Sequence, residues 1–382
     1  MEFLWCLGFG IWGLRFFMRL FLCGDVMTGR GIDQALPHSS NPILYEPCIR
    51  DAREYVDLAE KANGPIPRPV SFDYIWGDLL PELERAEVDL RIVNLETAIT
   101  SAETAWPDKG IHYRMHPRNI ACLSAARISA CALANNHVLD WGYDGLVETV
   151  RILDAAYIAH AGAGHDAEEA AAPAILNVPG KGRALLLSFG STTSGVPRDW
   201  RATGVSPGVN LLDDLSEATA SQIVSEMREH QQSGDLLIAS VHWGSNWGYE
   251  IPRQQIVFAH RLIEEGVAMV HGHSSHHVKA IEIFKGRLIL YGCGDFLTDY
   301  EGISGYENFR GDLAVMYLIE LDPTNGQLVD AQLVPMQMRL FRIEHTSAAD
   351  AAWLCDLLNK LSGSFGTQTR LNKDESLTVK SL

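Results

Sequence analysis

Short apolar runs alternate with helical hydrophobic patterns along most of the chain from Met18 onward. The apolar runs end in polar residues and lie at residues 18–25, 91–96, 128–134, 184–189, 236–242 and 268–273. Helical periodicity is found between them, at residues 79–90, 144–156, 216–232 and 253–265. Strands that alternate with helices predict an α/β fold, in which polar side chains at the strand ends carry the function.

The second half of the chain changes to paired strands. Residues 280–284 and 287–292 flank a Lys285-Gly286 turn, and residues 313–321 and 328–340 flank a turn with Asn325-Gly326. An Asn-Gly pair between apolar runs is a hairpin signal. The proline-rich stretch at residues 37–69 predicts an irregular loop, and long loops often border active sites.

These patterns predict a single catalytic domain at residues 18–345 with an appendage at each end. Residues 346–382 are expected to form a helix and a polar tail. Residues 1–17 include an uncharged apolar run from Phe3 to Leu14, which is too short to span a bilayer. It also lacks the basic start and small-residue cleavage site of a signal peptide. We therefore expect residues 1–17 to be dispensable for folding.

Composition excludes some classes of partner and favours a reducing compartment. The 382 residues carry a net charge of −17, so no basic surplus exists to bind the phosphates of a nucleic acid. The seven cysteines include no CxxC pair, which argues against a disulfide scaffold or a zinc ribbon. With no spanning segment, the sequence predicts a cytoplasmic protein that acts on a small or polymeric anionic substrate.

Potential metal ligands follow five of the predicted strands. Asp25 and Glu96 are carboxylates, Asn136 is followed by His137, and four histidines lie within residues 271–277. The complete set at the strand ends is Asp25, Glu96, Asn136, His137, His242, His271, His273, His276 and His277. Carboxylate, carboxamide and imidazole together suit Mn, Fe or Zn better than Ca or Mg. So many ligands favour two divalent metal ions that share one site.

Six ordered motifs between residues 18 and 345 carry a resemblance to a known family. They are Gly24-Asp25-Val-Met27, Asn94-Leu-Glu96, Asn135-Asn136-His137, His242-Trp243-Gly244, Gly272-His273-Ser-Ser-His276 and Gly294-Asp295-Phe296. In this order they resemble the CapA, or poly-gamma-glutamate capsule synthesis, family, which is similar to the calcineurin-like metallophosphoesterases. The resemblance implies two facing mixed β-sheets between layers of helices, a four-layer α/β sandwich with metals at the strand ends.

The resemblance also implies roles for individual residues. Asp25 would hold the first metal, Glu96 would bridge both metals, and His137 would protonate the leaving oxygen as the catalytic residue. Asn136 and His242 would hold the second metal, and His273 and His276 would complete the site. The superfamily has Asp-x-His where this chain has Asp25-Val-Met27, so one imidazole ligand is missing.

Other residues near these motifs are candidates for contacting substrate or orienting the ligands. Arg30 suits an anionic group because its guanidinium matches carboxylates and phosphates, and the Trp243 ring suits a pocket wall. Asp295 stands where the family more often has Asn, and it would orient a ligating histidine. The remaining candidates flank the ligands, namely Asn135, His271 and His277.

Three functions remain open from the sequence. The first is a metal-dependent hydrolase that acts on a phosphoester or on a gamma-glutamyl or other amide bond. The second is a non-hydrolytic accessory protein of polyglutamate or capsule biosynthesis that binds metal and polymer. The third is a soluble natural-product or amide-forming enzyme on the same scaffold. Function is decided by the site rather than by the fold, so the choice depends on geometry.

Overall fold

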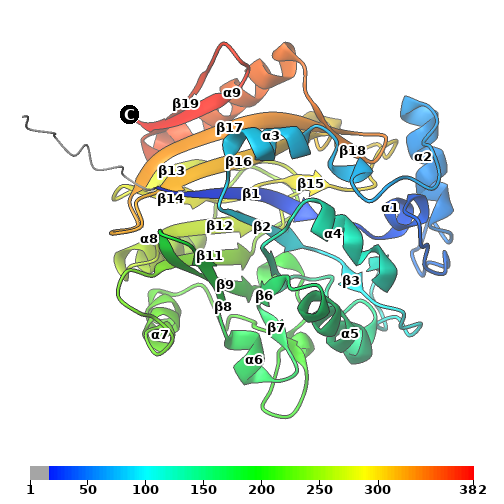
Figure 1. The fold of residues 1–382 in the computed structure, drawn as a ribbon, viewed down its shortest axis with the longest axis horizontal. Coiled ribbons are helices and arrows are strands. Elements are labelled where there is room, and N and C mark those ends of the chain that lie inside the picture. Colours follow the sequence, from blue (N-terminus) through cyan, green and yellow to red (C-terminus); the bar gives the residue numbers. More distant parts are fainter. Residues whose placement is uncertain (1–16) are drawn as a thin grey trace, which may run out of the picture.

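The computed structural model describes residues 17–382 of the chain, and the appendage expected at residues 1–17 therefore lies almost entirely outside the described residues. In the described part, two β-sheets contain most of the strands. Figure 1 shows these strands running across the middle of the molecule, with helices around them. Within residues 17–382, no helix is both long and apolar enough to cross a membrane.

The large sheet has ten strands and is parallel on one side of β1 and antiparallel on the other. In spatial order its main path is β19 (Thr367–Leu371), β20 (Leu377–Ser381), β17 (Leu328–Arg339), β16 (Leu313–Leu321), β1 (Met18–Val26), β2 (Leu90–Leu95), β5 (Ala130–Ala132) and β6 (Ala159–Ala161). Two short strands pair outside this path, β15 (Asp295–Leu297) with β1 and β18 (Arg342–His345) with β17.

The small sheet has six strands and is parallel at its centre. Its order is β13 (Ile281–Phe284), β14 (Arg287–Leu290), β12 (Met269–His273), β11 (Leu236–His242), β9 (Gly182–Gly190) and β8 (Ala174–Val178). Two further strand pairs lie outside both sheets, β3 (Ala98–Ile99) with β4 (Arg114–Met115) and β7 (Ala163–Gly164) with β10 (Gly208–Val209).

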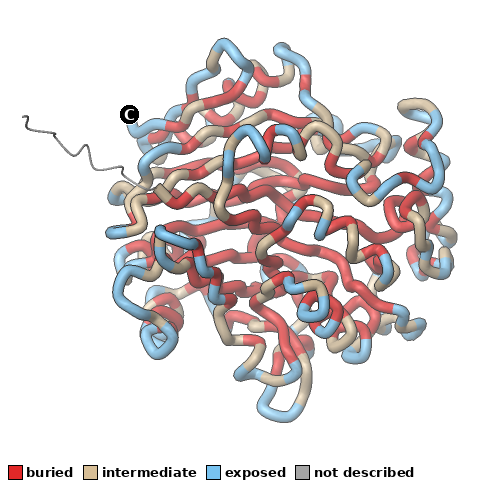
Figure 2. The backbone as a smooth tube through the Cα atoms, viewed as in Figure 1, coloured by how far each residue is buried: buried red, intermediate tan, exposed pale blue. Residues whose placement is uncertain are grey.

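Helices surround the two sheets. They are α1 (Arg30–Ala35), α2 (Arg53–Asn63), α3 (Leu79–Ala86), α4 (Ala121–Ala125), α5 (Gly142–Ala155), α6 (Ala167–Ala171), α7 (Glu217–Met227), α8 (Arg253–Glu264) and α9 (Ala348–Ser362). Short 3-10 turns are found at Tyr74–Trp76, Pro117–Ile120, Thr192–Ser194, Arg198–Trp200, Glu307–Phe309 and Gly363–Phe365. Figure 2 shows that the buried residues follow the strands and the exposed residues follow the outer helices and loops.

Alternate residues of each central strand belong to different hydrophobic cores. In β1, Leu20 and Leu22 lie in the core between the two sheets, whereas Phe21 lies in a core with helices α2 to α5. In β9, Leu187 lies in a third core, formed with α7 and α8. Successive side chains of a strand point to opposite faces, so three cores require four layers. The two facing mixed sheets flanked by helices that the resemblance implied are therefore confirmed.

Two predicted segments contain more regular structure than the sequence analysis expected. The irregular loop at residues 37–69 includes the 11-residue helix α2. The expected tail after residue 345 forms α9 and then the strands β19 and β20, and β20 pairs with β17 of the large sheet. Leu377 and Val379 are buried in the core between the sheets, because alternate positions of this short strand are apolar.

The end of β1 exchanges one neighbour for another just before the functional residues. Residues 18–22 pair with β16, whereas Asp25 is in register with Asp295 of β15. This exchange requires a close approach at Gly24, where an added Cβ would lie 1.6 Å from the Gly294 carbonyl oxygen. Glycine at this position therefore allows Asp25 to reach the strand end beside Asp295.

Candidate metal site

Polar residues from both sheets meet where the parallel strands end. Asp25 lies near the end of β1 and Glu96 directly follows β2 in the large sheet, while Asn136 lies in the loop after β5. His242 and His273 end β11 and β12 of the small sheet and are in register with each other. Because the carboxyl ends of parallel strands share one edge, both sheets contribute side chains to one site.

Three buried side chains form the centre of this site. Ligand atoms of Asp25, His242 and His273 all lie within 4.8 Å of one another. His242 Nδ1 lies 2.8 Å from His273 Nδ1, and His273 Nδ1 lies 3.8 Å from Asp25 Oδ1. Such a set of one carboxylate and two imidazoles matches ligands of catalytic zinc and related ions.

Glu96 and Asn136 extend the cluster on the other side of His242. Asn136 Oδ1 lies 2.9 Å from His242 Nε2, and Glu96 Oε1 lies 3.7 Å from the same nitrogen. The carboxyl groups of Glu96 and Asp25 are also close enough to raise the pKa of Glu96. Glu96 is thus close to both Asp25 and His242.

His276 approaches the cluster from the loop after β12. Its Nδ1 lies 2.9 Å from Asp295 Oδ1, and its Nε2 lies 2.9 Å from the side-chain nitrogen of Asn246. Although burial disfavours its charged form, the pKa of His276 is raised by Asp295 and Asp25. All six residues that the sequence analysis expected to bind metal therefore lie in one connected group.

The pKa values of the clustered side chains are shifted in directions that suit the binding of a cation. Burial, followed by repulsion from Asp295, raises the pKa of Asp25 to about 7. Burial also raises the pKa of Glu96 well above its usual value, and nearby Asp25 adds to this shift. Burial lowers the pKa of both His242 and His273, which favours the neutral imidazole that binds a metal.

The unsatisfied polar atoms also fit a metal ion. Glu96 Oε2 and Asp295 Oδ2 are buried and have no hydrogen-bond partner among the described residues. Buried carboxylate oxygens without partners are costly, and a bound cation is one of the few groups that can satisfy them. The orphaned oxygens and the facing imidazole nitrogens of His242 and His273 show that these residues fit divalent metal ions.

His137 is held differently from the other histidines. Its Nδ1 lies 2.7 Å from Asp140 Oδ2 and 3.1 Å from Lys109 Nζ, and its Nε2 lies 3.7 Å from Glu96 Oε1. Lys109 also pairs with Asp140 Oδ1 at 2.6 Å. Burial and then the charge of Lys109 lower the pKa of His137 well below its usual value. The imidazole is thus fixed through Nδ1, and its other nitrogen is directed at the site.

A cavity of about 140 Å³ opens beside the cluster. Glu96, Asn136, His137 and His276 line it, so candidate ligands and the candidate acid share one space. The sequence analysis did not identify the other lining residues, Lys109, Ile111, Tyr113, Asn246, Ser274 and Tyr300. Most of them lie in loops, where no periodic pattern or strand end marks them.

Four further candidates lie near the ligands and make other contacts. Asn135 Oδ1 accepts hydrogen bonds from the backbone N–H groups of His137 and Val138, which shapes their loop. His271 Nε2 lies 2.8 Å from the Cys23 carbonyl oxygen, away from the cluster. His277 Nδ1 lies 3.0 Å from the Val278 carbonyl oxygen. Asp295, described above, contacts His276.

Arg30 and Trp243 are engaged in other contacts. Arg30 is buried and binds Asp299 through two nitrogens, at 3.1 and 2.5 Å, and Glu46 at 2.9 Å. The Trp243 ring lies in the small-sheet core, where its Nε1 donates to the Tyr291 carbonyl oxygen at 3.0 Å. Each is thus buried against partners within the protein, and the expectation that they contact substrate or orient the ligands stays a prediction.

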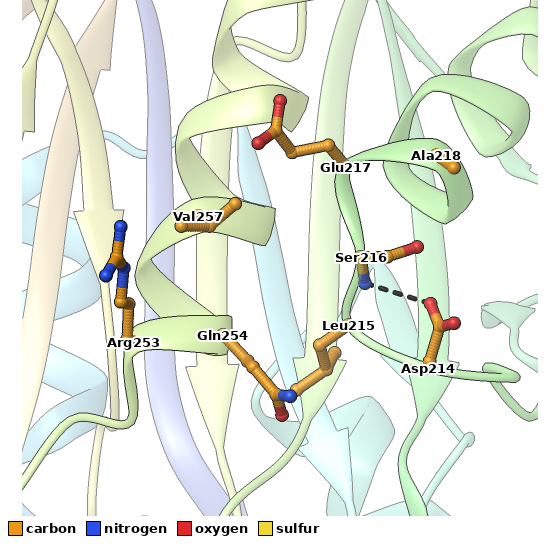
Figure 3. A pocket seen from close by; sticks show the side chains of 8 residues that line it. All are labelled: Asp214, Leu215, Ser216, Glu217, Ala218, Arg253, Gln254 and Val257. Carbon is orange, nitrogen blue, oxygen red and sulfur yellow. Dashed lines mark hydrogen bonds between the residues drawn. The ribbon is translucent and has the colours of Figure 1, made fainter.

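A larger hollow of about 530 Å³ lies away from the cluster, at the starts of α7 and α8. Figure 3 shows its lining, in which the Ser216 backbone nitrogen donates to Asp214. The charged residues of the lining are Asp214, Glu217 and Arg253. This hollow is larger than the cavity beside the cluster, but none of the candidate metal ligands lines it. We therefore do not assign the functional site to it.

Comparisons with known proteins agree with the resemblance found in the sequence. A family profile described as bacterial capsule synthesis protein PGA_cap matches residues 19–300. A probable polyglutamine synthesis accessory protein of Mycobacterium tuberculosis (strain ATCC 25618 / H37Rv) is 44% identical over 363 residues, which cover 95% of this chain and 96% of the relative. The capsule biosynthesis protein CapA of Bacillus anthracis is 24% identical, over 84% of this chain and 68% of the relative.

Among solved structures, one match is the crystal structure of a novel phosphatase from Mycoplasma pneumoniae. It has a TM-score of 0.46 and 12% sequence identity, and covers 87% of this chain and 96% of that chain. The family profile spans the small sheet, part of the large sheet and every candidate metal ligand, and the mycobacterial relative aligns over nearly the whole chain. The chain therefore belongs to the PGA_cap family of bacterial capsule synthesis proteins.

Proposed function

We propose that this chain is a metal-dependent hydrolase of capsule or polyglutamate biosynthesis, acting on a phosphoester or a gamma-glutamyl or other amide bond. The observation that carries the proposal is the convergence of Asp25, His242 and His273 within 4.8 Å, beside a cavity. Divalent ions at such a site polarise the reacting group and lower the pKa of a water molecule. Asp25, Glu96, Asn136, His242, His273 and His276 would hold two ions, of which Mn, Fe and Zn suit this donor set.

The chain's own residues provide the other parts of a hydrolytic site. His137 lies on the cavity wall, and Lys109 can donate a hydrogen bond to its Nδ1, which leaves the one proton of the neutral ring on Nε2. Nε2 can give that proton to a leaving oxygen or nitrogen while Nδ1 takes a proton from the Lys109 ammonium. Asp140 pairs with Lys109 at 2.6 Å and lies 2.7 Å from Nδ1, so it keeps both groups in place. Lys109 also lines the cavity, so its ammonium group can attract an anionic substrate.

The proposal is tested with purified protein by metal analysis followed by a substrate screen. The probes are p-nitrophenyl phosphate, bis-p-nitrophenyl phosphate and gamma-glutamyl-p-nitroanilide, each assayed with Mn²⁺, Fe²⁺ or Zn²⁺ added to the metal-free protein. We expect one probe class to be turned over only when metal is present. The His137→Ala variant serves as the control for catalysis that arises from free metal. Metal-loaded protein that turns over no probe, and no poly-gamma-glutamate, would contradict the hydrolase.

A second candidate function is supported by the names of the relatives. The mycobacterial relative is named a synthesis accessory protein, and a Bacillus subtilis relative is named a PGA biosynthesis protein. In this alternative the site binds metal and an anionic polymer without cleaving it. Poly-gamma-glutamate that binds only in the presence of metal, and whose length is unchanged after long incubation, would favour this function over the hydrolase.

A further inference from the structure

Asp295 lies next to Asp25 at the edge of the large sheet. The two residues are paired in register in the parallel ladder between β15 and β1, and Asp25 N donates to the Gly294 carbonyl oxygen at 2.9 Å. Residues in register on parallel strands point to the same face of a sheet. The carboxyl groups are close enough that Asp295 raises the pKa of Asp25. Two carboxylates therefore lie side by side on the metal side of the sheet.

Only half of the Asp295 carboxylate is satisfied. Its Oδ1 lies 2.9 Å from His276 Nδ1, whereas its Oδ2 is buried and has no hydrogen-bond partner among the residues described. The whole residue is 3% exposed, so bulk water does not solvate this oxygen. Orienting His276 requires only one acceptor oxygen. This role alone therefore does not explain why a second, negatively charged oxygen is buried without a hydrogen bond.

Met27, two residues after Asp25, offers no suitable donor to an ion held by Asp25. Its sulfur is buried and receives a contact from the Tyr300 hydroxyl at 3.7 Å. Thioethers are soft ligands that suit Cu(I), whereas Mn, Fe and Zn bind oxygen and imidazole nitrogen. A further ligand for that ion must therefore come from another residue close to Asp25.

We propose that Asp295 is itself a metal ligand, which supplies the donor that Met27 cannot. This inference rests on the proposed metal-dependent function. Its oxygen lies 2.9 Å from the nitrogen of His276. Because Oδ1 is engaged with His276, Oδ2 is the atom that remains to bind an ion, and it is buried without a partner among the described residues.

The direct test is a crystal structure of the full chain grown with Mn²⁺, with the ions located by anomalous scattering. We expect an Asp295 oxygen within about 2.3 Å of one ion, a normal length for a carboxylate on such a metal. The inference is wrong if Mn²⁺ occupies the site of Asp25, His242 and His273 while both Asp295 oxygens stay beyond about 3 Å from every ion. A structure without any Mn²⁺ would contradict the proposed function as well, so the two failures are distinguishable.

A titration in solution tests the same inference without crystals or activity. Metal-free protein is titrated with Mn²⁺, and free Mn²⁺ is measured by electron paramagnetic resonance. We expect the wild type to bind two ions and Asp295→Asn to bind one, because the amide keeps an acceptor for His276 but loses the charge. Binding of two ions by Asp295→Asn with unchanged affinity would overturn the inference.

Glu282→Gln is the matched control for the loss of a buried carboxylate. Glu282 is buried in the small sheet, where it contacts His260 at 2.9 Å and Tyr291 at 2.7 Å, and it is not among the candidate ligands. We expect this variant to bind two ions, as the wild type does. If it also lost one ion, the effect of Asp295→Asn would reflect general damage to the sheets, and the inference would fall.

Discussion

His137 and Glu96 approach each other to 3.7 Å, yet their other contacts assign them different roles. Nδ1 of His137 is held by Asp140 and Lys109, while Glu96 has one oxygen without a partner. We predict that His137→Ala keeps its metal while turnover falls by about 10² to 10⁴, the usual contribution of a general acid. Glu96→Ala should lose both metal and turnover. Metal content by mass spectrometry and rates on one substrate check both variants.

Two results would contradict this assignment. Equal metal loss in His137→Ala and Glu96→Ala would make His137 a ligand instead of a proton donor. Unchanged turnover in both variants, on a substrate that the wild type processes, would remove the hydrolase and leave the accessory function.

The sequence identified the side chains at strand ends more accurately than those in loops. Asp25, His242 and His273 could be predicted to meet because each comes at or near the end of a buried strand, and such ends share an edge. Lys109 could not be predicted, because it lies in a loop that reaches the cavity only through tertiary contacts. The sequence did not predict that Arg30 pairs with two buried carboxylates, because these lie 16 and 269 residues away in the chain.

At the scale of elements, Arg30 joins α1 to two distant segments. It binds Glu46 in the loop before α2 and Asp299 after β15, and both ion pairs are almost fully buried. Removal of one partner from a buried ion pair typically costs about 3 to 5 kcal/mol, because the remaining charges lie unpaired in the interior. We predict that Arg30→Met lowers the free energy of unfolding by about that amount, measured by urea denaturation.

Arg53→Met is the matched control for the Arg30 variant. Arg53 pairs with Asp51 on the surface, where water screens the charges. The urea midpoint of this variant should equal that of the wild type. If both variants shifted the midpoint equally, the buried network around Arg30 would not be what stabilises this region.

Asp33 in α1 predicts a dependence of stability on pH. It accepts hydrogen bonds from the backbone of Ser40 and His116 and from Asn119, but burial raises its pKa to about 6. Between about pH 4 and 6 the folded protein keeps a proton that the unfolded chain releases. This group's stabilisation is therefore complete below about pH 4 and is lost as the pH rises through 6, by roughly 3 kcal/mol in total.

The measurement compares unfolding free energies at pH 4.5 and pH 7 for the wild type and Asp33→Asn. The amide cannot release a proton in this range, so the fall in stability between the two pH values should be smaller in the variant. An identical fall in both proteins would show that Asp33 has an ordinary pKa in the folded state.

Elements with strong periodicity were predicted well from the sequence, and elements that depend on tertiary contacts were not. Strand β16 covers residues 313–321, as the apolar run indicated, and β11 covers residues 236–242. The sequence does not indicate helix α2, because prolines dominate its surroundings. It does not indicate strands β19 and β20 either, because they form the edge of the large sheet, where six of their ten positions are exposed or intermediate.

At the scale of the whole molecule, the site joins the two sheets. Asp25 and Glu96 come from the large sheet, and His242 and His273 from the small one. A cation that binds the folded state but not the unfolded chain stabilises by mass action. We predict that Mn²⁺ raises the melting temperature of the metal-free protein and that a chelator reverses the rise. Glu96→Ala should show no rise, and an equal rise in that variant would place the bound metal elsewhere.

The position of the site between the sheets also has a consequence for the order of events in folding. Its ligands span residues 25 to 276, so they come together only after the sheets have docked across the core that contains Leu20 and Leu186. Contacts absent from the folding transition state affect the unfolding rate and leave the folding rate unchanged. A bound ion would accordingly slow unfolding without speeding folding, so it would lengthen the lifetime of the native protein.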